Sequence, residues 1–138
     1  MLGVSNYTQD YVDACRTRVR DQLAAYRALS DGGGNAANGA LENFEPGFFA
    51  HMVLALDNCF VHRLRNKELK DGNSLNEVRL LATSIMSNDG VLVADKQIKL
   101  KPDTSVLGLA AGEEIAIDTD GFARLSEAFF EEIERKYV

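Results

Sequence analysis

The residue types best suited to chemistry gather in one stretch, FFAHMVLALDNCFVHRLR, which covers residues 48–65. It sets two histidines, an aspartate, an asparagine and two arginines in a strongly apolar background. If the stretch is one helix with about 100° of rotation per residue, four of its polar residues share a stripe and Asp57 falls within an apolar face. We call these five residues the seam, and they are the candidate ligand-binding residues: His51, Asp57, Asn58, His62 and Arg65.

The seam gives little support for metal binding or catalysis. Imidazole is a common metal ligand, but His51 and His62 lie eleven positions apart, so about 16 Å of helix separates them and one ion cannot bind both. The motifs HExxH and GxSxG and the Walker sequence do not occur, and no nucleophile has a visible activating partner. We predict no metal and no other cofactor, while the residue types leave both an enzyme and a non-enzyme open.

A basic cluster, HRLRNK at residues 62–67, ends the stretch and has two interpretations. Cations at the C-terminus of a helix complement the helix macrodipole and need no ligand. Alternatively, the cluster binds a small anion, which is then one candidate partner of the protein. Lysines further along the chain would strengthen such a site if the fold brought them near: Lys70, Lys96, Lys99 and Lys101.

Asp57 needs a partner of its own, because an isolated charge on an apolar face is unfavourable unless it is paired. A continuous helix places Arg63 about 120° away around the axis, which is too far to reach Asp57 comfortably. We therefore expect an arginine from another helix, with Arg79 and Arg27 as the leading candidates.

The chain of 138 residues has the length of one domain, so residues 1–138 are expected to share a single core. A net charge of −6 and a pI near 4.9 oppose binding to nucleic acid and to anionic membranes. The first ten residues lack the basic and apolar segments of a signal peptide, and no apolar run is long enough to span a membrane. We expect a cytoplasmic protein in which Cys15 and Cys59 are two buried thiols.

Two helices are expected in the first half of the chain. Apolar residues in steps of three and four predict a helix over residues 7–29, and a flexible break rich in glycine and asparagine follows at residues 30–39. Pro46 suits the first turn of a second helix, which runs to about residue 66.

Two more helices are expected in the second half. Ser74 and Glu77 can form a capping box, so a third helix begins at residue 75 and ends at the Asn-Asp-Gly turn of residues 88–90. A fourth helix covers residues 119–137. Its inward residues are Phe122, Leu125, Phe129, Ile133 and Tyr137.

The segment between the last two helices, residues 90–118, has no helical pattern, and we call it the arm. IKLK and EIAID alternate between apolar and polar residues, which predicts a short β-ribbon or an extended arm. Two roles are open. As a strap, the arm covers one end of the bundle; as a lid or dimerisation arm, it offers Val106, Leu107 and Leu109 to a shared surface.

These elements predict an all-α fold, a roughly antiparallel four-helix bundle with a small β-ribbon or extended arm between the third and fourth helices. Its general architecture resembles that of the DinB-like proteins, which are small four-helix bundles often built around a histidine-bound metal. The resemblance implies a metal site, although those proteins commonly use three histidines and this chain has two.

Two functional classes follow from this fold. The expected class is a non-catalytic assembly or partner-binding protein, most simply a homodimer. The alternative is a small-ligand-binding or metal-dependent bundle, similar to the DinB-like proteins, with its site along the seam.

Overall fold

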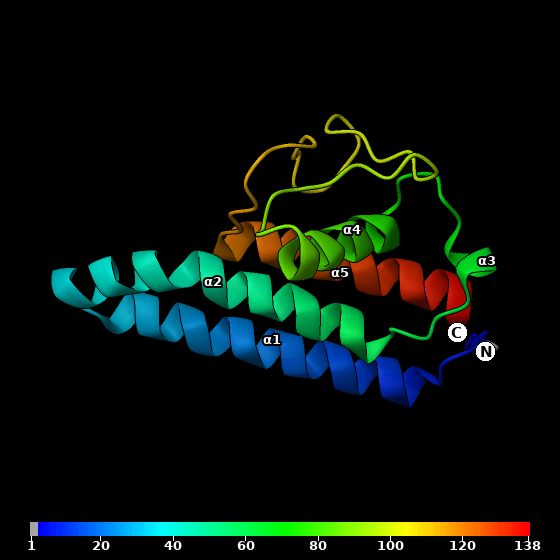
Figure 1. Ribbon diagram of the computed structural model, residues 1–138. Helices are drawn as coiled ribbons and strands as arrows, with labels where there is room; N and C mark the ends of the chain where they lie inside the picture. The colour runs from blue at the N-terminus through cyan, green and yellow to red at the C-terminus, as the bar shows by residue number, and fades with distance from the viewer. Residues whose placement is uncertain (1–2) are drawn as a thin grey trace.

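The computed structural model describes residues 3–138, apart from the side chain of Ala36, and its regular structure is helical (Figure 1). The helices are α1 (Gln9–Gly32), α2 (Asn35–Cys59), α3 (Arg65–Glu68), α4 (Ser74–Ser87) and α5 (Thr119–Tyr137). The four long helices pack on one another, with α2 against α4 and α1 against α5. The predicted all-α class is confirmed, and the single-turn α3 is an addition to it.

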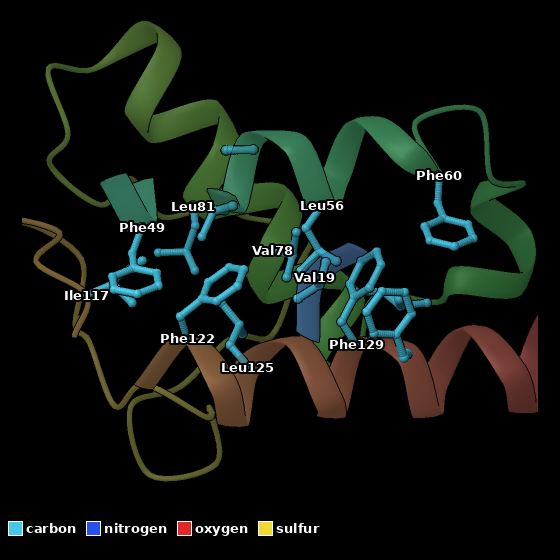
Figure 2. Close-up of a cluster of buried hydrophobic side chains, with 14 of the residues drawn as sticks. Val19, Phe49, Leu56, Phe60, Val78, Leu81, Ile117, Phe122, Leu125 and Phe129 are labelled. Carbon is cyan, nitrogen blue, oxygen red and sulfur yellow. The ribbon is translucent and has the colours of Figure 1, made fainter. Parts of the chain in front are cut away.

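The terminal helix α5 has the bounds that its apolar spacing predicts. Asp118 caps the helix, because its carboxylate accepts a hydrogen bond from the Gly121 N–H at 2.7 Å. The five residues predicted to face inward are all fully buried. Figure 2 shows several of them pointing from α5 toward apolar side chains of α2 and α4, so this face forms the centre of the core.

The first helix begins two residues later and ends three residues later than predicted, and its outer end leaves the core. Thr8 caps α1 by accepting a hydrogen bond from the Tyr11 N–H at 3.1 Å. The apolar face is buried from Val12 to Tyr26, but Leu29, the last member of the predicted face, is 63% exposed. Figure 1 shows why: the hairpin of α1 and α2 extends beyond the ends of α4 and α5.

The flexible break predicted after the first helix is nearly absent, because Gly33 and Gly34 alone separate α1 from α2. The start of α2 is held against α1 by a hydrogen bond from the Tyr26 hydroxyl to the Leu41 carbonyl at 3.2 Å. Pro46 therefore lies inside α2 instead of in its first turn. Its ring nitrogen has no N–H, so α2 lacks one main-chain hydrogen bond at that point.

The end of α2 was also predicted wrongly, since the helix stops at Cys59 and does not continue to residue 66. The chain beyond it pairs with the N-terminal segment. The Val4 N–H donates to the His62 carbonyl at 2.7 Å, and the Leu64 N–H donates to the Val4 carbonyl at 2.8 Å. In a longer helix, the His62 carbonyl and the Leu64 N–H would form helical hydrogen bonds. Because both groups bond to Val4 instead, the chain turns away before α3.

The start of α4 differs from the predicted capping box by one residue. Asn73 is the cap, because its side-chain carbonyl accepts hydrogen bonds from the N–H groups of Leu75 at 2.9 Å and Asn76 at 3.2 Å. Ser74 is already in the helix, and its hydroxyl donates to a main-chain carbonyl of α5 at 2.9 Å. Glu77 turns toward the arm instead of back to Ser74.

The arm contains no β-ribbon within the described residues, so of the two predicted alternatives the structure shows the extended arm. Its strand-like pairing is limited to one isolated antiparallel bridge between Val91 and Glu114. Pro102 lacks a main-chain donor, and Gly108 and Gly112 have φ of 71° and 91°, which turn the chain at both positions. The alternating segments are therefore too short and too bent to pair.

The arm instead covers the core of its own chain, as the strap interpretation predicts (Figure 1). Val106, Leu107 and Leu109 pack against the core with partial burial. Four further apolar residues of the segment are buried: Leu92, Ile98, Ile115 and Ile117. The apolar residues of the arm thus have an intramolecular role.

Glu77 of α4 holds the arm in place. Its two carboxylate oxygens accept hydrogen bonds from the Val106 N–H at 2.7 Å and the Leu107 N–H at 2.9 Å. Burial raises the pKa of the Glu77 carboxyl, while these two N–H groups and the charge of Arg124 act in the opposite direction. The Arg124 guanidinium also donates to the Val106 carbonyl at 3.0 Å, so the same turn of the arm is fixed from α5.

Candidate functional site

The seam does not form one continuous site, because α2 ends in the middle of it. His51 and Asn58 lie on the exposed face of α2, while His62 and Arg65 follow the helix and are also exposed. Asp57 is the half-buried member. The stripe predicted from a continuous helix therefore breaks after Cys59.

The seam residues contribute to two different hollows of the surface. Asp57 and Asn58 line an open groove of about 570 Å³ between α2 and α4, which also includes Met86. His62 and Arg65 line a second hollow of about 330 Å³ beside the N-terminal segment, which we call the basic pocket; its remaining residues are Gly3, Val61, Arg63, Leu64, Asn66 and Arg79. His51 lines neither hollow.

A dense polar arrangement lies beneath the basic pocket, and we call it the buried charge cluster. Its members come from the end of α2, from the turn before α3, from α3 itself and from α4: Asp57, Arg63, Glu68, Asn76 and Arg79. The side chains of Arg63 and Glu68 are 0% exposed, so both charges depend on partners within the protein.

Glu68 is the centre of the cluster. Arg63 Nε donates to Glu68 Oε1 at 2.7 Å. Arg79 approaches with its planar fork, Nη2 at 2.7 Å from Oε1 and Nε at 3.0 Å from Oε2. Asn76 Nδ2 completes the set at 2.9 Å from Oε2. Each carboxylate oxygen therefore has at least two donors.

Arg63 is the partner of Asp57, so both of the arginines predicted for that role are wrong. Arg63 Nη1 lies 3.0 Å from Asp57 Oδ1, while Arg79 binds Glu68 and Arg27 pairs with Asp120. The prediction assumed one continuous helix. Because α2 ends at Cys59, the chain turns and brings Arg63 back toward Asp57.

The remaining donors of Arg63 tie the same turn together. Nη1 also donates to the Phe60 carbonyl at 3.1 Å, and Nη2 donates to the Leu75 carbonyl at 3.2 Å. The guanidinium carbon lies 5.5 Å from the centre of the Phe129 ring, within cation–π range. One side chain thus links the end of α2, the start of α4 and the core face of α5.

The charges of the cluster balance, with two arginines against two carboxylates. Burial pushes the pKa of the Glu68 carboxyl upward, but the hydrogen bond from Arg79 and the charges of Arg63 and Arg79 outweigh it, so that the pKa is lowered overall. Glu68 is therefore ionised at neutral pH and saturated with donors. This arrangement fits a structural role and is unsuited to proton transfer.

Changing Asp57 tests that structural role. Asp57→Asn should lower the free energy of unfolding by roughly 1–3 kcal/mol and Asp57→Ala by somewhat more, because buried Arg63 loses a counter-charge. Thermal and urea unfolding measure the effect. His51→Ala, on the exposed face of the same helix, is the control and should leave the melting temperature unchanged. A more stable Asp57→Asn variant would instead indicate a residue held for function at the expense of stability.

Sequence reasoning missed Glu68 and Asn76 as members of this cluster. Glu68 lies within the segment KELKDG, which has the composition of an exposed turn, and no local pattern indicates a fully buried carboxylate. The available signal was the strongly apolar surrounding of Arg63, which requires an acidic partner nearby.

The described part of the chain contains no cluster of side chains suited to binding a metal ion. Among residues 3–138, no three histidine, cysteine, aspartate or glutamate side chains gather closely enough to bind one. No helix in the same residues combines the length and apolar character needed to cross a bilayer.

Comparisons of the chain with protein family models, with curated proteins and with solved structures find no match.

Proposed function

We propose that the protein is a non-catalytic assembly module that forms a homodimer through the free end of the α1–α2 hairpin. We call this surface the hairpin tip, residues 27–44. The observation that carries the proposal is the exposure of Leu29 (63%) and Phe44 (54%) on the part of the hairpin that extends beyond the other helices (Figure 1). Large apolar side chains on a projecting element are typical of a contact surface.

Phe44 is suited to act as an anchor because neighbouring rings hold it in place. It stacks on Phe48 with ring centroids 5.3 Å apart, and Phe48 stacks on Tyr26 at 5.6 Å. This aromatic series connects the exposed ring to the buried core. A side chain held in one orientation loses little conformational entropy when a partner covers it.

A second copy of the chain is the partner that suits the hairpin tip. Near the core, α1 and α2 are covered by α5 and α4, and Asp120 of α5 still reaches Arg27, but the side chains of Leu29 and Phe44 remain exposed on the projecting part of the hairpin. A second hairpin would supply two more helices and restore four-helix packing, with the same surface used by both copies. Small exposed residues of the tip permit close approach: Ala28, Ala37, Gly39 and Ala40.

Serine substitutions at the hairpin tip should dissociate the dimer. In Leu29→Ser/Phe44→Ser, the dimer dissociation constant measured by sedimentation should rise at least about tenfold, because the two largest apolar contacts are lost. Both side chains are exposed in the single chain, so circular dichroism should show an unchanged fold.

The matched control is Met86→Ser, which removes an apolar side chain that is 71% exposed in the groove between α2 and α4. It should leave the dissociation constant unchanged. A wild-type chain that sediments as a monomer at every concentration contradicts the proposal, and a dimer broken by Met86→Ser alone would move the interface to that groove.

A second candidate function is the binding of a small anion in the basic pocket. His62, Arg65 and Arg79 contribute three cationic or protonatable side chains to a hollow on an otherwise acidic protein. Among residues 3–138, no hydrogen bond engages Arg79 Nη1, although Nε and Nη2 hold Glu68. A guanidinium fixed in this way is well suited to phosphate or carboxylate.

Titration with inorganic phosphate tests this candidate. Calorimetry at low ionic strength should give a dissociation constant of about 1 mM or below, and Arg65→Ala should weaken binding about tenfold. Lys101→Ala, which removes an exposed cation of the arm, is the control and should bind phosphate like the wild type. Absence of heat in the wild-type titration would exclude the pocket as a phosphate site.

A further inference from the structure

The two cysteines occupy corresponding positions on neighbouring helices. The register of the α1–α2 hairpin is marked by Tyr26 and Phe48, whose rings stack 5.6 Å apart. Cys15 precedes Tyr26 by eleven positions, and Cys59 follows Phe48 by eleven positions. Because eleven residues make about three full helical turns, both cysteines return to the facing sides of their antiparallel helices.

The surroundings of the cysteines agree with this register. Cys15 and Cys59 line one hollow of about 330 Å³ between the two helices, together with Arg18 and Met52. Arg18 Nη2 lies 3.3 Å from Cys15 Sγ. The Tyr11 hydroxyl donates to the Cys59 carbonyl at 2.5 Å, which fixes the end of α2 against α1 at this level.

The two thiols differ in access to solvent. Cys15 is 1% exposed, so a dissolved oxidant cannot reach it directly. Cys59 is partly exposed in the hollow. The pKa of Cys59 is raised overall, because burial and the adjacent Cys15 thiol outweigh the opposing effect of Arg18.

We propose that Cys59 and Cys15 form a peroxide-oxidisable dithiol, in which Cys59 reacts with the peroxide and Cys15 closes an intramolecular disulfide between α2 and α1. This goes beyond the proposed assembly function and does not depend on it, because the dithiol lies away from the hairpin tip.

The reaction has two balanced steps. The Cys59 thiolate attacks one oxygen of hydrogen peroxide; the S–O bond forms, the O–O bond breaks and hydroxide leaves, giving sulfenic acid. The Cys15 sulfur, which lies 3.3 Å from Arg18 Nη2, then gives up its proton and attacks the Cys59 sulfur, so that the S–S bond forms, the S–O bond breaks and a second hydroxide leaves. The protons of the two thiols convert both hydroxides to water. Two electrons pass from the thiols to the peroxide.

Hydrogen peroxide itself is the probe for the test. Wild-type protein treated with peroxide should lose the mass of two hydrogen atoms, lose both of the thiols that are alkylated in denaturant before oxidation, and remain one chain on a non-reducing gel. Cys15→Ser should instead stop at a sulfenic acid on Cys59 that dimedone traps. Cys59→Ser should oxidise at least about tenfold more slowly than wild type, because its remaining thiol is buried.

Two results would overturn the proposal. One is wild-type protein that keeps both thiols alkylatable under conditions that oxidise free glutathione. The other is oxidation that yields only disulfides between two chains. Circular dichroism confirms that the variants fold, and Cys15→Ala replaces Cys15→Ser if the buried hydroxyl proves disruptive.

Discussion

Glu68→Gln is expected to lower the free energy of unfolding by about 3–5 kcal/mol. The amide removes the negative charge that lies between Arg63 and Arg79, and Arg63 is fully buried. It also replaces one carboxylate oxygen with an N–H donor, which then faces guanidinium and amide donors at hydrogen-bonding distance. Urea unfolding followed by circular dichroism measures the change.

Glu127→Gln is the matched control for this prediction. Glu127 accepts two hydrogen bonds from Arg20, at 2.8 and 3.0 Å, so the pair has the same fork geometry as Glu68 with Arg79. The side chains of Arg20 and Glu127 are 60% and 42% exposed, and solvent screening limits the contribution of such pairs to less than about 1 kcal/mol. If Glu68→Gln and Glu127→Gln lower the free energy of unfolding equally, burial does not strengthen the Glu68 interactions.

The same carboxylate predicts how stability changes in acid. The pKa of Glu68 is lowered in the folded chain from an unfolded value near 4.5. The contribution of ionised Glu68 to the free energy of unfolding is therefore complete above pH 4.5, and it is lost as the pH falls below that value. Glu77 changes stability in the opposite direction. Because its pKa is raised in the folded chain, the folded chain binds a proton there more readily than the unfolded chain does, which stabilises the fold as the pH falls. The difference between wild type and Glu68→Gln isolates the first effect: it should shrink as the pH falls below about 4.5.

The fold was predictable from the sequence where the bounds of a helix depend only on residues within or next to it. Helix α5 has an aspartate cap, an apolar face with helical spacing and solvent on its other side, and its predicted bounds are correct. The boundaries of α2 failed for a different reason. Its end depends on pairing with Val4, and its early residues depend on contact with Tyr26, so both are decided by segments far away in the sequence.

The candidate site failed for the same reason. The seam required a helix that continued past Cys59, and once the chain turns there four of its residues divide between two hollows, with His51 in neither. Asp57 was correctly expected to pair with an arginine, because a half-buried charge needs a partner, but the identity of Arg63 depended on that turn. Glu68 could not be assigned, since a carboxylate in a polar segment has no local signature of burial.

Gly72 is the position where backbone geometry leaves the least freedom for a side chain. Its φ is +90°, in the left-handed region that L-residues rarely adopt. A Cβ added there would lie 2.3 Å from the Lys99 carbonyl oxygen, which belongs to the arm. The arm cannot simply move away, because the Lys99 N–H donates to the Lys70 carbonyl at 3.0 Å and holds the two segments together.

Gly72→Ala should therefore destabilise the protein by about 3 kcal/mol or more, combining backbone strain with the clash against Lys99. Gly90→Ala separates the two causes, because Gly90 has a φ of +75° but no atom within 4 Å of an added Cβ, and it should cost about 1 kcal/mol. Urea unfolding compares the variants, and limited proteolysis should cut the arm faster in Gly72→Ala alone. If the two alanine variants lose the same stability, the close approach of the arm to Gly72 does not exist in solution.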